Sequence, residues 1–258
     1  MTITDILFKL IPVFSVSFFY ILEVAYNKRS WKFSARDSSL FLIEFFALLT
    51  SLGVSFLLFK PLVNFYGAFE LVSLSRAPLP HWLSFLISFL LLDLFVYTYH
   101  RLNHIVPLLW RFHRLHHADK EVDSFSSLLH HPFEILSNSI SIIAFYIFFD
   151  IPVVVVLAYY VSMTLHGAFS HTLMLLPKRL DLLLRYFVVT PNMHRVHHSI
   201  KSNEGNLNFG AIFPYWDKLF GTYLYIHNSA FKNFNFGIER KASPKFKSIS
   251  SLIVNPFI

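Results

Sequence analysis

Residues 82–117 read WLSFLISFLLLDLFVYTYHRLNHIVPLLWRFHRLHH, an apolar run that passes directly into a series of histidines. The apolar part, from Trp82 to about Tyr99, approaches the roughly 20 residues that a helix needs to cross a bilayer. It contains one charged side chain, Asp93. We predict a membrane helix that continues into His100 and His104 and so carries these histidines to one membrane face.

The chain contains four further apolar segments. The first two cover about residues 6–26 and 39–59, and the next two cover residues 135–149 and 153–165. The last two are short for a full crossing and are separated by Asp-Ile-Pro, so they predict a tight or tilted helical hairpin. Residues 70–81 contain two prolines and predict a loop or interfacial stretch. We therefore expect an all-α integral membrane protein with about four transmembrane helices or helical hairpins.

Composition supports a membrane protein over a soluble one. Hydrophobic residues form 55% of the 258-residue chain and charged residues only 14%, against about 25% charged in a typical globular domain. The chain also holds 31 Phe, which suits a lipid-facing exterior. The N-terminal apolar segment lacks a small-x-small cleavage site and predicts a retained helix rather than a signal peptide.

The formal net charge of +7 does not indicate a nucleic-acid partner, because its basic residues flank apolar segments. Such flanks mark the cytoplasmic side of membrane helices and touch anionic membrane lipids. One basic group follows the first apolar segment, at positions 28–36, and a second surrounds the histidines after residue 100. Two crossings separate these groups, so both lie on one face. We expect a helical, His-rich, metal-binding cap on the cytoplasmic face.

Eight of the fourteen histidines fall into three compact motifs. These are HxxxH and two copies of HxxHH, formed by His100 and His104, by His113, His116 and His117, and by His194, His197 and His198. On a helix, residues three and four apart share a face. One such motif is common by chance, but three in one chain predict a metal site, because buried imidazoles without partners are costly.

The kind of metal follows less directly. The chain has no Cys, which excludes disulfides, iron–sulfur clusters, Cys-bound zinc and thiolate catalysis. Imidazole binds iron, zinc and copper, so ligand type cannot separate these metals. Eight ligands exceed the three or four of a single zinc site and fit two ions. The zinc-protease pattern HExxH is absent from the sequence, and we favour iron, which activates dioxygen.

The motifs resemble the fatty acid hydroxylase/sterol desaturase superfamily over about residues 93–223. The similarity includes Asp93 and Tyr97 before His100, the run LWRFH at 109–113, and HPFE at 131–134. Thr-Pro at 190–191, Asn-Phe-Gly at 208–210 and WDKLFGT at 216–222 also match, with Phe209 where Tyr is more usual. This resemblance implies a catalytic domain over residues 81–230, between N-terminal transmembrane helices with a connecting loop (1–80) and a basic tail (231–258).

The resemblance also implies further site residues. His171 is expected as a ninth ligand from the membrane hairpin, with His166 as the weaker alternative. Asp93 and Glu134 are expected to contact ligands rather than metal. His131 is expected either to do the same, which we favour, or to be a tenth ligand. Asp93 would accept a ring N–H of a ligating imidazole or cap a polar pocket.

The activity that the resemblance implies is O2-dependent hydroxylation or desaturation of a C–H bond in a lipid, at two iron ions. Electrons would come from a separate ferredoxin or cytochrome b5 type protein. The short chain, without a fused cytochrome b5 domain, favours a bacterial inner membrane, or the endoplasmic reticulum of a eukaryote. The alternatives are a metal transporter or metal-binding membrane module, a bis-His haem carrier, and a hydrolase with a His-bound metal pair. Transporters place ligands at the bilayer midplane, whereas these motifs lie at helix ends.

Overall fold

The computed structural model describes residues 3–27, 42, 57, 61, 73–227, 231 and 234–238. Every regular element in these ranges is helical, and the bridge between Ser199 and Phe236 is an isolated antiparallel pair. The predicted helical fold class is confirmed for this part of the chain. Apart from residues 42 and 57, the predicted apolar segment 39–59 lies outside the described residues.

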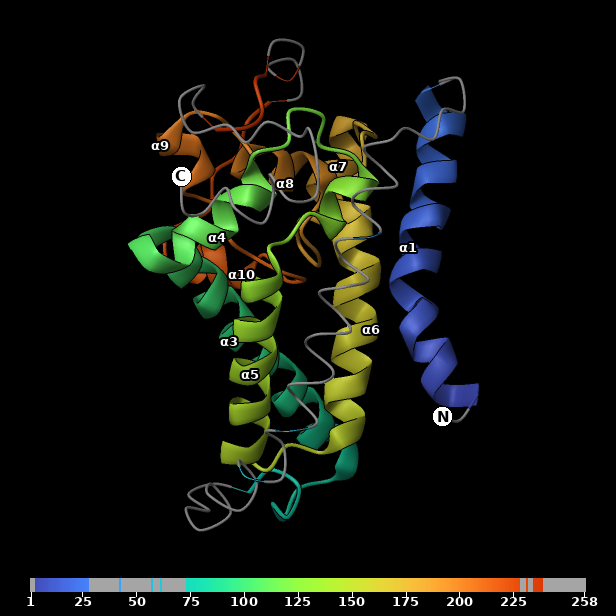
Figure 1. Cartoon of the computed structure of the whole chain (residues 1–258), viewed down its shortest axis with the longest axis vertical. Helices are drawn as coiled ribbons and strands as arrows, with labels where there is room; N and C mark the ends of the chain where they lie inside the picture. The colour runs from blue at the N-terminus through green and yellow to red at the C-terminus, as the bar shows by residue number, and fades with distance from the viewer. Residues whose placement is uncertain are drawn as a thin grey trace.

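Four long helices run side by side along the long axis of the molecule (Figure 1). They are α1 (Ile3–Asn27), α3 (His81–Ile105), α5 (Pro132–Phe148) and α6 (Val153–Ser170). Two of them, α3 and α6, are long and apolar enough to span a membrane, while α5 and the apolar part of α1 are shorter. About four crossings therefore remains a prediction. The expected continuation of α3 through His100 and His104 is confirmed.

Prolines fix where the site-bearing helices begin. Pro107 is the first residue of α4 (Pro107–His117), and Val106 before it is extended, which ends α3. Pro191 likewise begins α8 (Pro191–His197), whose first turn is capped by the Thr190 hydroxyl accepting from the Met193 amide. Because proline needs no helical hydrogen bond at this position, each sharp bend in the chain directs a short histidine helix across the ends of the long ones.

The predicted hairpin between α5 and α6 is confirmed. Its turn places Asp150 at φ 42°, a left-handed conformation that Asp tolerates better than most residues. The Asp150 carboxylate accepts hydrogen bonds from the hydroxyls of Ser73 and Ser75 and pairs with Arg76 at 3.3 Å. Residues 73–80 form the irregular stretch that the prolines predicted.

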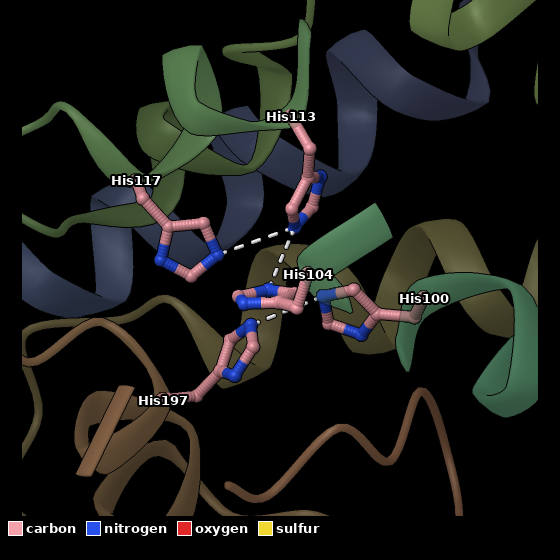
Figure 2. A group of neighbouring side chains, drawn as sticks. All are labelled: His100, His104, His113, His117 and His197. Atoms are coloured by element: carbon pink, nitrogen blue, oxygen red, sulfur yellow. Dashed lines mark hydrogen bonds between the residues drawn. The ribbon is translucent and has the colours of Figure 1, made fainter. Parts of the chain in front are cut away.

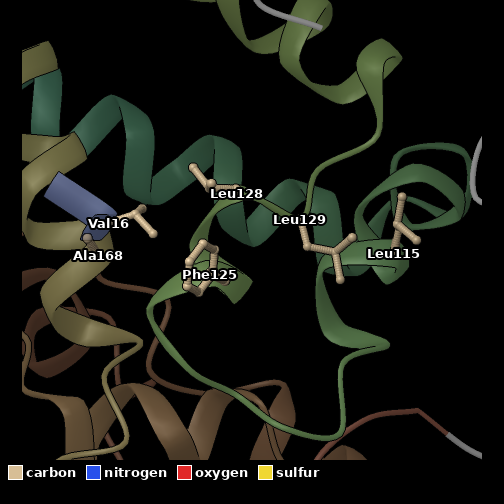
Figure 3. Packing of buried hydrophobic residues seen from close by; sticks show 6 residues of the cluster. All are labelled: Val16, Leu115, Phe125, Leu128, Leu129 and Ala168. Atoms are coloured by element: carbon tan, nitrogen blue, oxygen red, sulfur yellow. The ribbon is translucent and has the colours of Figure 1, made fainter. Parts of the chain in front are cut away.

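The remaining short helices are η2 (Ser124–Leu128), α7 (Lys178–Leu184), α9 (Ser202–Gly205) and α10 (Tyr215–Leu219). With α4 and α8, η2 and α7 gather near the end of the bundle where α6 ends (Figure 1). A buried cluster joins this end to the bundle (Figure 3), formed by Val16, Leu115, Phe125, Leu128, Leu129 and Ala168. Glu23 of α1 adds a polar anchor, since its carboxylate accepts from Ser124 and from the Leu173 amide.

Candidate metal centre

Nine histidines converge at the end of the bundle where α6 ends. They come from α3, α4 and α8 and from the residues that directly follow α6 and α8. They form two groups, and within each group the nearest ring nitrogens all lie within 4.8 Å of one another. The first group, drawn in Figure 2, contains His100, His104, His113, His117 and His197. The second contains His116, His171, His194 and His198. All nine histidines expected as ligands are thus brought together.

The two HxxHH motifs each contribute to both groups. His113 and His117 join the first group and His116 the second, whereas His194 and His198 join the second group and His197 the first. Helical phase explains this exchange, because residue i+4 lies about 40° from residue i, while i+3 lies about 60° away on the other side. Each motif therefore bridges two sites that adjoin, with the rings of His117 and His198 stacked at 4.6 Å.

Acceptors outside the groups fix the tautomer of five rings. The Nδ1 atoms of His100, His197 and His171 donate to the backbone carbonyls of Phe209, Leu207 and Gly167 at 2.9, 3.0 and 2.7 Å. Nδ1 of His113 meets the Glu134 carboxylate at 2.7 Å, and Nδ1 of His104 meets the Asn206 side-chain oxygen at 3.1 Å. A neutral imidazole that donates from Nδ1 has a bare lone pair at Nε2.

These bare Nε2 atoms face one another. Nε2 of His113 lies 3.1 Å from Nε2 of His104, and Nε2 of His197 lies 3.0 Å from Nε2 of His100. Neither pair has a hydrogen left to share, so two lone pairs meet at hydrogen-bond distance. A bound cation would turn this repulsion into coordination, and an acceptor for the second ring N–H is the usual support for a histidine ligand. The residues present therefore fit metal ions.

Burial keeps the rings neutral. It lowers the pKa of His113 and of His171 to about 3, and the pKa values of His116, His117 and His197 fall well below the usual 6.5 for the same reason, with neighbouring histidines adding to the effect. Desolvation disfavours the charged imidazolium. Neutral imidazole is the form that binds a metal, so the environment prepares these side chains as ligands at neutral pH.

The residues expected to contact the ligands lie in three different settings. Glu134 bonds His113 directly, as that expectation requires. Asp93 contacts no histidine and accepts instead from the Tyr159 hydroxyl, the Trp216 indole and the amides of residues 212 and 213, which is the polar-pocket alternative. His131 caps α5 by accepting from the Phe133 amide. His166 contacts the Val189 carbonyl and belongs to neither group.

Two residues near the groups were missed by sequence reasoning. His130 stacks on His116, with ring centroids 4.5 Å apart and planes at 11°, and its only sequence signal is its place beside His131. Arg195 is buried between ligands of both groups and donates to the Thr172 carbonyl at 2.8 Å. Its position inside the HRVHH motif gave no indication that the guanidinium donates to the backbone carbonyls of Thr172 and Met174.

A cavity of about 310 Å³ reaches both groups. Its walls come from α1, α3, α5 and α6, and its histidine end includes His100 and His113 of the first group and His116, His171 and His194 of the second. Beyond the histidines the walls become more apolar, with residues such as Val96, Ile142 and Met163. Such a concave, mostly apolar space with a few polar groups is the usual form of a small-molecule site.

Comparison with known proteins supports the same region. The fatty acid hydroxylase family profile matches residues 85–222. The human alkylglycerol monooxygenase is 28% identical over 137 residues, covering 53% of this chain and 29% of the relative. The ornithine lipid hydroxylase OlsE of Rhizobium tropici is 32% identical over 130 residues, covering 50% of this chain and 38% of the relative.

The matched part of this chain thus spans about a third of the length of these curated relatives. No solved structure matches significantly. The family profile covers more than half of the 258 residues, and the histidine motifs and the cavity lie within or against the matched segment. The chain belongs to the fatty acid hydroxylase family.

Proposed function

We propose that this protein is a membrane-bound di-iron, O2-dependent oxidoreductase that hydroxylates or desaturates a C–H bond of a lipid. The observation that carries the proposal is the convergence of nine imidazoles into two adjoining groups, several of which donate the second ring N–H to a backbone carbonyl. The relatives, named as a lipid hydroxylase and an alkylglycerol monooxygenase, support a lipid substrate.

The proposed ligand sets are the two histidine groups, five residues for one ion and four for the other. Iron bound there would supply the activation of dioxygen that an unreactive C–H bond requires. Iron is favoured over zinc because hydroxylation and desaturation are redox reactions, and zinc has no redox chemistry. An all-nitrogen ligand set without cysteine is compatible with iron.

The chain itself would contribute orientation and exclusion of water. The carbonyls of Phe209, Leu207 and Gly167 and the carboxylate of Glu134 hold four rings in one tautomer, so the ligand nitrogens keep their directions. The histidines of both groups from α4 and α8 are buried, which limits water at the reacting carbon. The cavity would align an acyl or sterol-like substrate against both groups.

Hydroxylation by O2 consumes two electrons and two protons in addition to the substrate. We propose that a separate ferredoxin or cytochrome b5 type protein supplies the electrons. We also propose that the histidine-bearing end of the bundle faces the cytoplasm, in a bacterial inner membrane or in the endoplasmic reticulum of a eukaryote. The basic flanks of the apolar segments support this orientation.

The test is lipid analysis after incubation with isotopically labelled dioxygen. Membranes with the iron-loaded protein and a reducing system should yield a lipid that gains one labelled oxygen atom, or one that loses two hydrogens without gaining label. His116→Ala and His197→Ala, one from each group, should abolish the product. His81→Ala is the matched control, because this exposed histidine begins α3 far from both groups. A product that forms without dioxygen, or in both site variants, would exclude the proposal.

A further inference from the structure

The cavity changes character along α5. Glu134 bonds the proposed ligand His113, Asn138 follows one helical turn later, and Ile142 follows one turn after that. All three line the cavity, as expected for residues four apart on one helical face. The wall thus passes, moving away from the histidines, from a carboxylate through an amide to an aliphatic side chain.

Two amides in this wall lack hydrogen-bond partners among the described residues. The Oδ1 atom of Asn138 is buried and unpaired. Asn103 lies between His100 and His104 on α3, is 5% exposed and lines the same cavity, and its side chain makes no hydrogen bond within the described part of the chain. A buried amide without a partner costs free energy. A ligand in the cavity is the natural partner.

The hydroxyls of the wall, by contrast, are already satisfied. The hydroxyls of Ser139 and Thr164 each donate to a carbonyl of their own helix at 2.8 Å, and the Tyr99 hydroxyl donates to Ser137 at 2.7 Å. The two amides therefore differ from their neighbours. Each can both donate and accept a hydrogen bond, so each suits a hydroxyl, ether, ester or amide.

The wall carries no cation for a charged headgroup. None of the cavity-lining residues is Lys or Arg, and the one carboxylate of the wall, Glu134, bonds His113 through Oε1 while its Oε2 is buried without a partner. A carboxylate or phosphate entering between the amides would lose its hydration without a side-chain countercharge. The group that fits here is polar and uncharged.

We propose that Asn103 and Asn138 form a subsite that binds an uncharged hydrogen-bonding group of the substrate lipid close to the carbon that is oxidised. The inference rests on the proposed function. Asn138 is one turn, about 5.4 Å, from the residue that supports ligand His113. The apolar tail then lies along Ile142 and Met163.

The experiment measures binding without turnover. Tritiated hexadecan-1-ol is bound to the purified, iron-loaded protein without oxygen, and hexadecanoate and 1-chlorohexadecane compete with it at about pH 8, where the carboxylate is ionised. In the wild type, the alcohol should bind at least about tenfold more tightly than the carboxylate. Asn138→Leu should weaken alcohol binding about tenfold, the typical effect of one lost buried hydrogen bond, and leave 1-chlorohexadecane unchanged. Ser141→Ala is the control on α5, because its hydroxyl bonds the carbonyl of Ser137 and Ser141 is not among the residues that line the cavity.

Equal affinity of the wild type for the alcohol and the carboxylate would overturn the subsite, and this comparison needs no variant. Wild-type alcohol affinity in both Asn138→Leu and Asn103→Leu would also overturn it. Iron content and product formation, measured on the same preparations, keep the two proposals separate. Amide-dependent alcohol binding in a protein without iron would support the subsite and exclude the di-iron function. Bound iron and product formation, together with alcohol binding that does not depend on the two amides, would support the di-iron function and exclude the subsite.

Discussion

Removing the carboxylate behind His113 should weaken the binding of one of the two proposed metal ions and leave the binding of the other unchanged. Glu134 Oε1 lies 2.7 Å from His113 Nδ1, and both side chains are less than one-tenth exposed. Glu134→Ala leaves that N–H without its acceptor and frees the ring to rotate. Loss of such a supporting group typically lowers metal affinity 10–100-fold, which corresponds to about 1.4–2.7 kcal/mol. Glu134→Gln keeps an acceptor oxygen and should lose less.

The assay is competition between the protein and a chelator for iron, in a titration that resolves two ions. The group containing His113 should bind iron more weakly than in the wild type, and the group containing His171 should keep its affinity for iron. Ser141→Ala on the same helix should match the wild type in both phases. Equal weakening of both sites, or a change of less than about threefold in the iron affinity of the group containing His113, would refute the assigned role of Glu134.

Three further results are expected. The metal-free protein should melt at a lower temperature when the pH falls from about 7 to about 5. Burial lowers the folded-state pKa of His113 and His171 to about 3, whereas the pKa of a histidine in the unfolded chain is about 6.5. Below pH 6.5 the unfolded chain therefore binds more protons than the folded protein, and the free energy of unfolding falls as the pH falls. A melting temperature that does not change over this pH range would contradict the prediction. Asp93→Ala should lower the melting temperature, at a cost of about 1–3 kcal/mol for each buried donor left without an acceptor, yet leave iron content intact, because its carboxylate bonds Tyr159, Trp216 and backbone amides but none of the nine clustered histidines. Loss of iron in a folded variant would show that Asp93 acts at the histidine groups. Gly167→Leu should retain iron but stop product formation. This glycine lines the cavity and an added Cβ meets nothing within 4 Å, so the leucine side chain fits and fills space meant for the substrate. Unchanged turnover would show that the cavity does not hold the substrate.

The sequence predicted the parts of this structure that repeat a simple spacing. The run from Trp82 into His100 and His104 indicated one continuous helix, and α3 is that helix. The apolar pair around Asp150 indicated a hairpin, which the structure contains. In each case the local spacing of apolar residues predicts the helix, and a proline marks where it begins or ends.

Long-range contacts were beyond this reasoning. The spacing of HxxHH places three rings on one face of a helix and sets the middle ring to one side of the other two. Which group each ring joins depends on how α4 and α8 face each other, and the sequence did not show this. The acceptors behind the rings, such as the carbonyls of Phe209 and Leu207, have no side-chain signal at all. Asp93 shows the same limit, because both of its expected roles satisfied the sequence and only packing against Tyr159 and Trp216 separates them.

The most direct test of the two-group metal centre is the iron content of purified protein with one group removed at a time. The wild type should hold about two irons per chain, one for each group. The double variant His104→Ala/His117→Ala and the double variant His194→Ala/His198→Ala should each hold about one, because each removes two ligands from a single group. One iron or none in the wild type, or the loss of all iron in both double variants while the fold persists, would contradict two separately held ions.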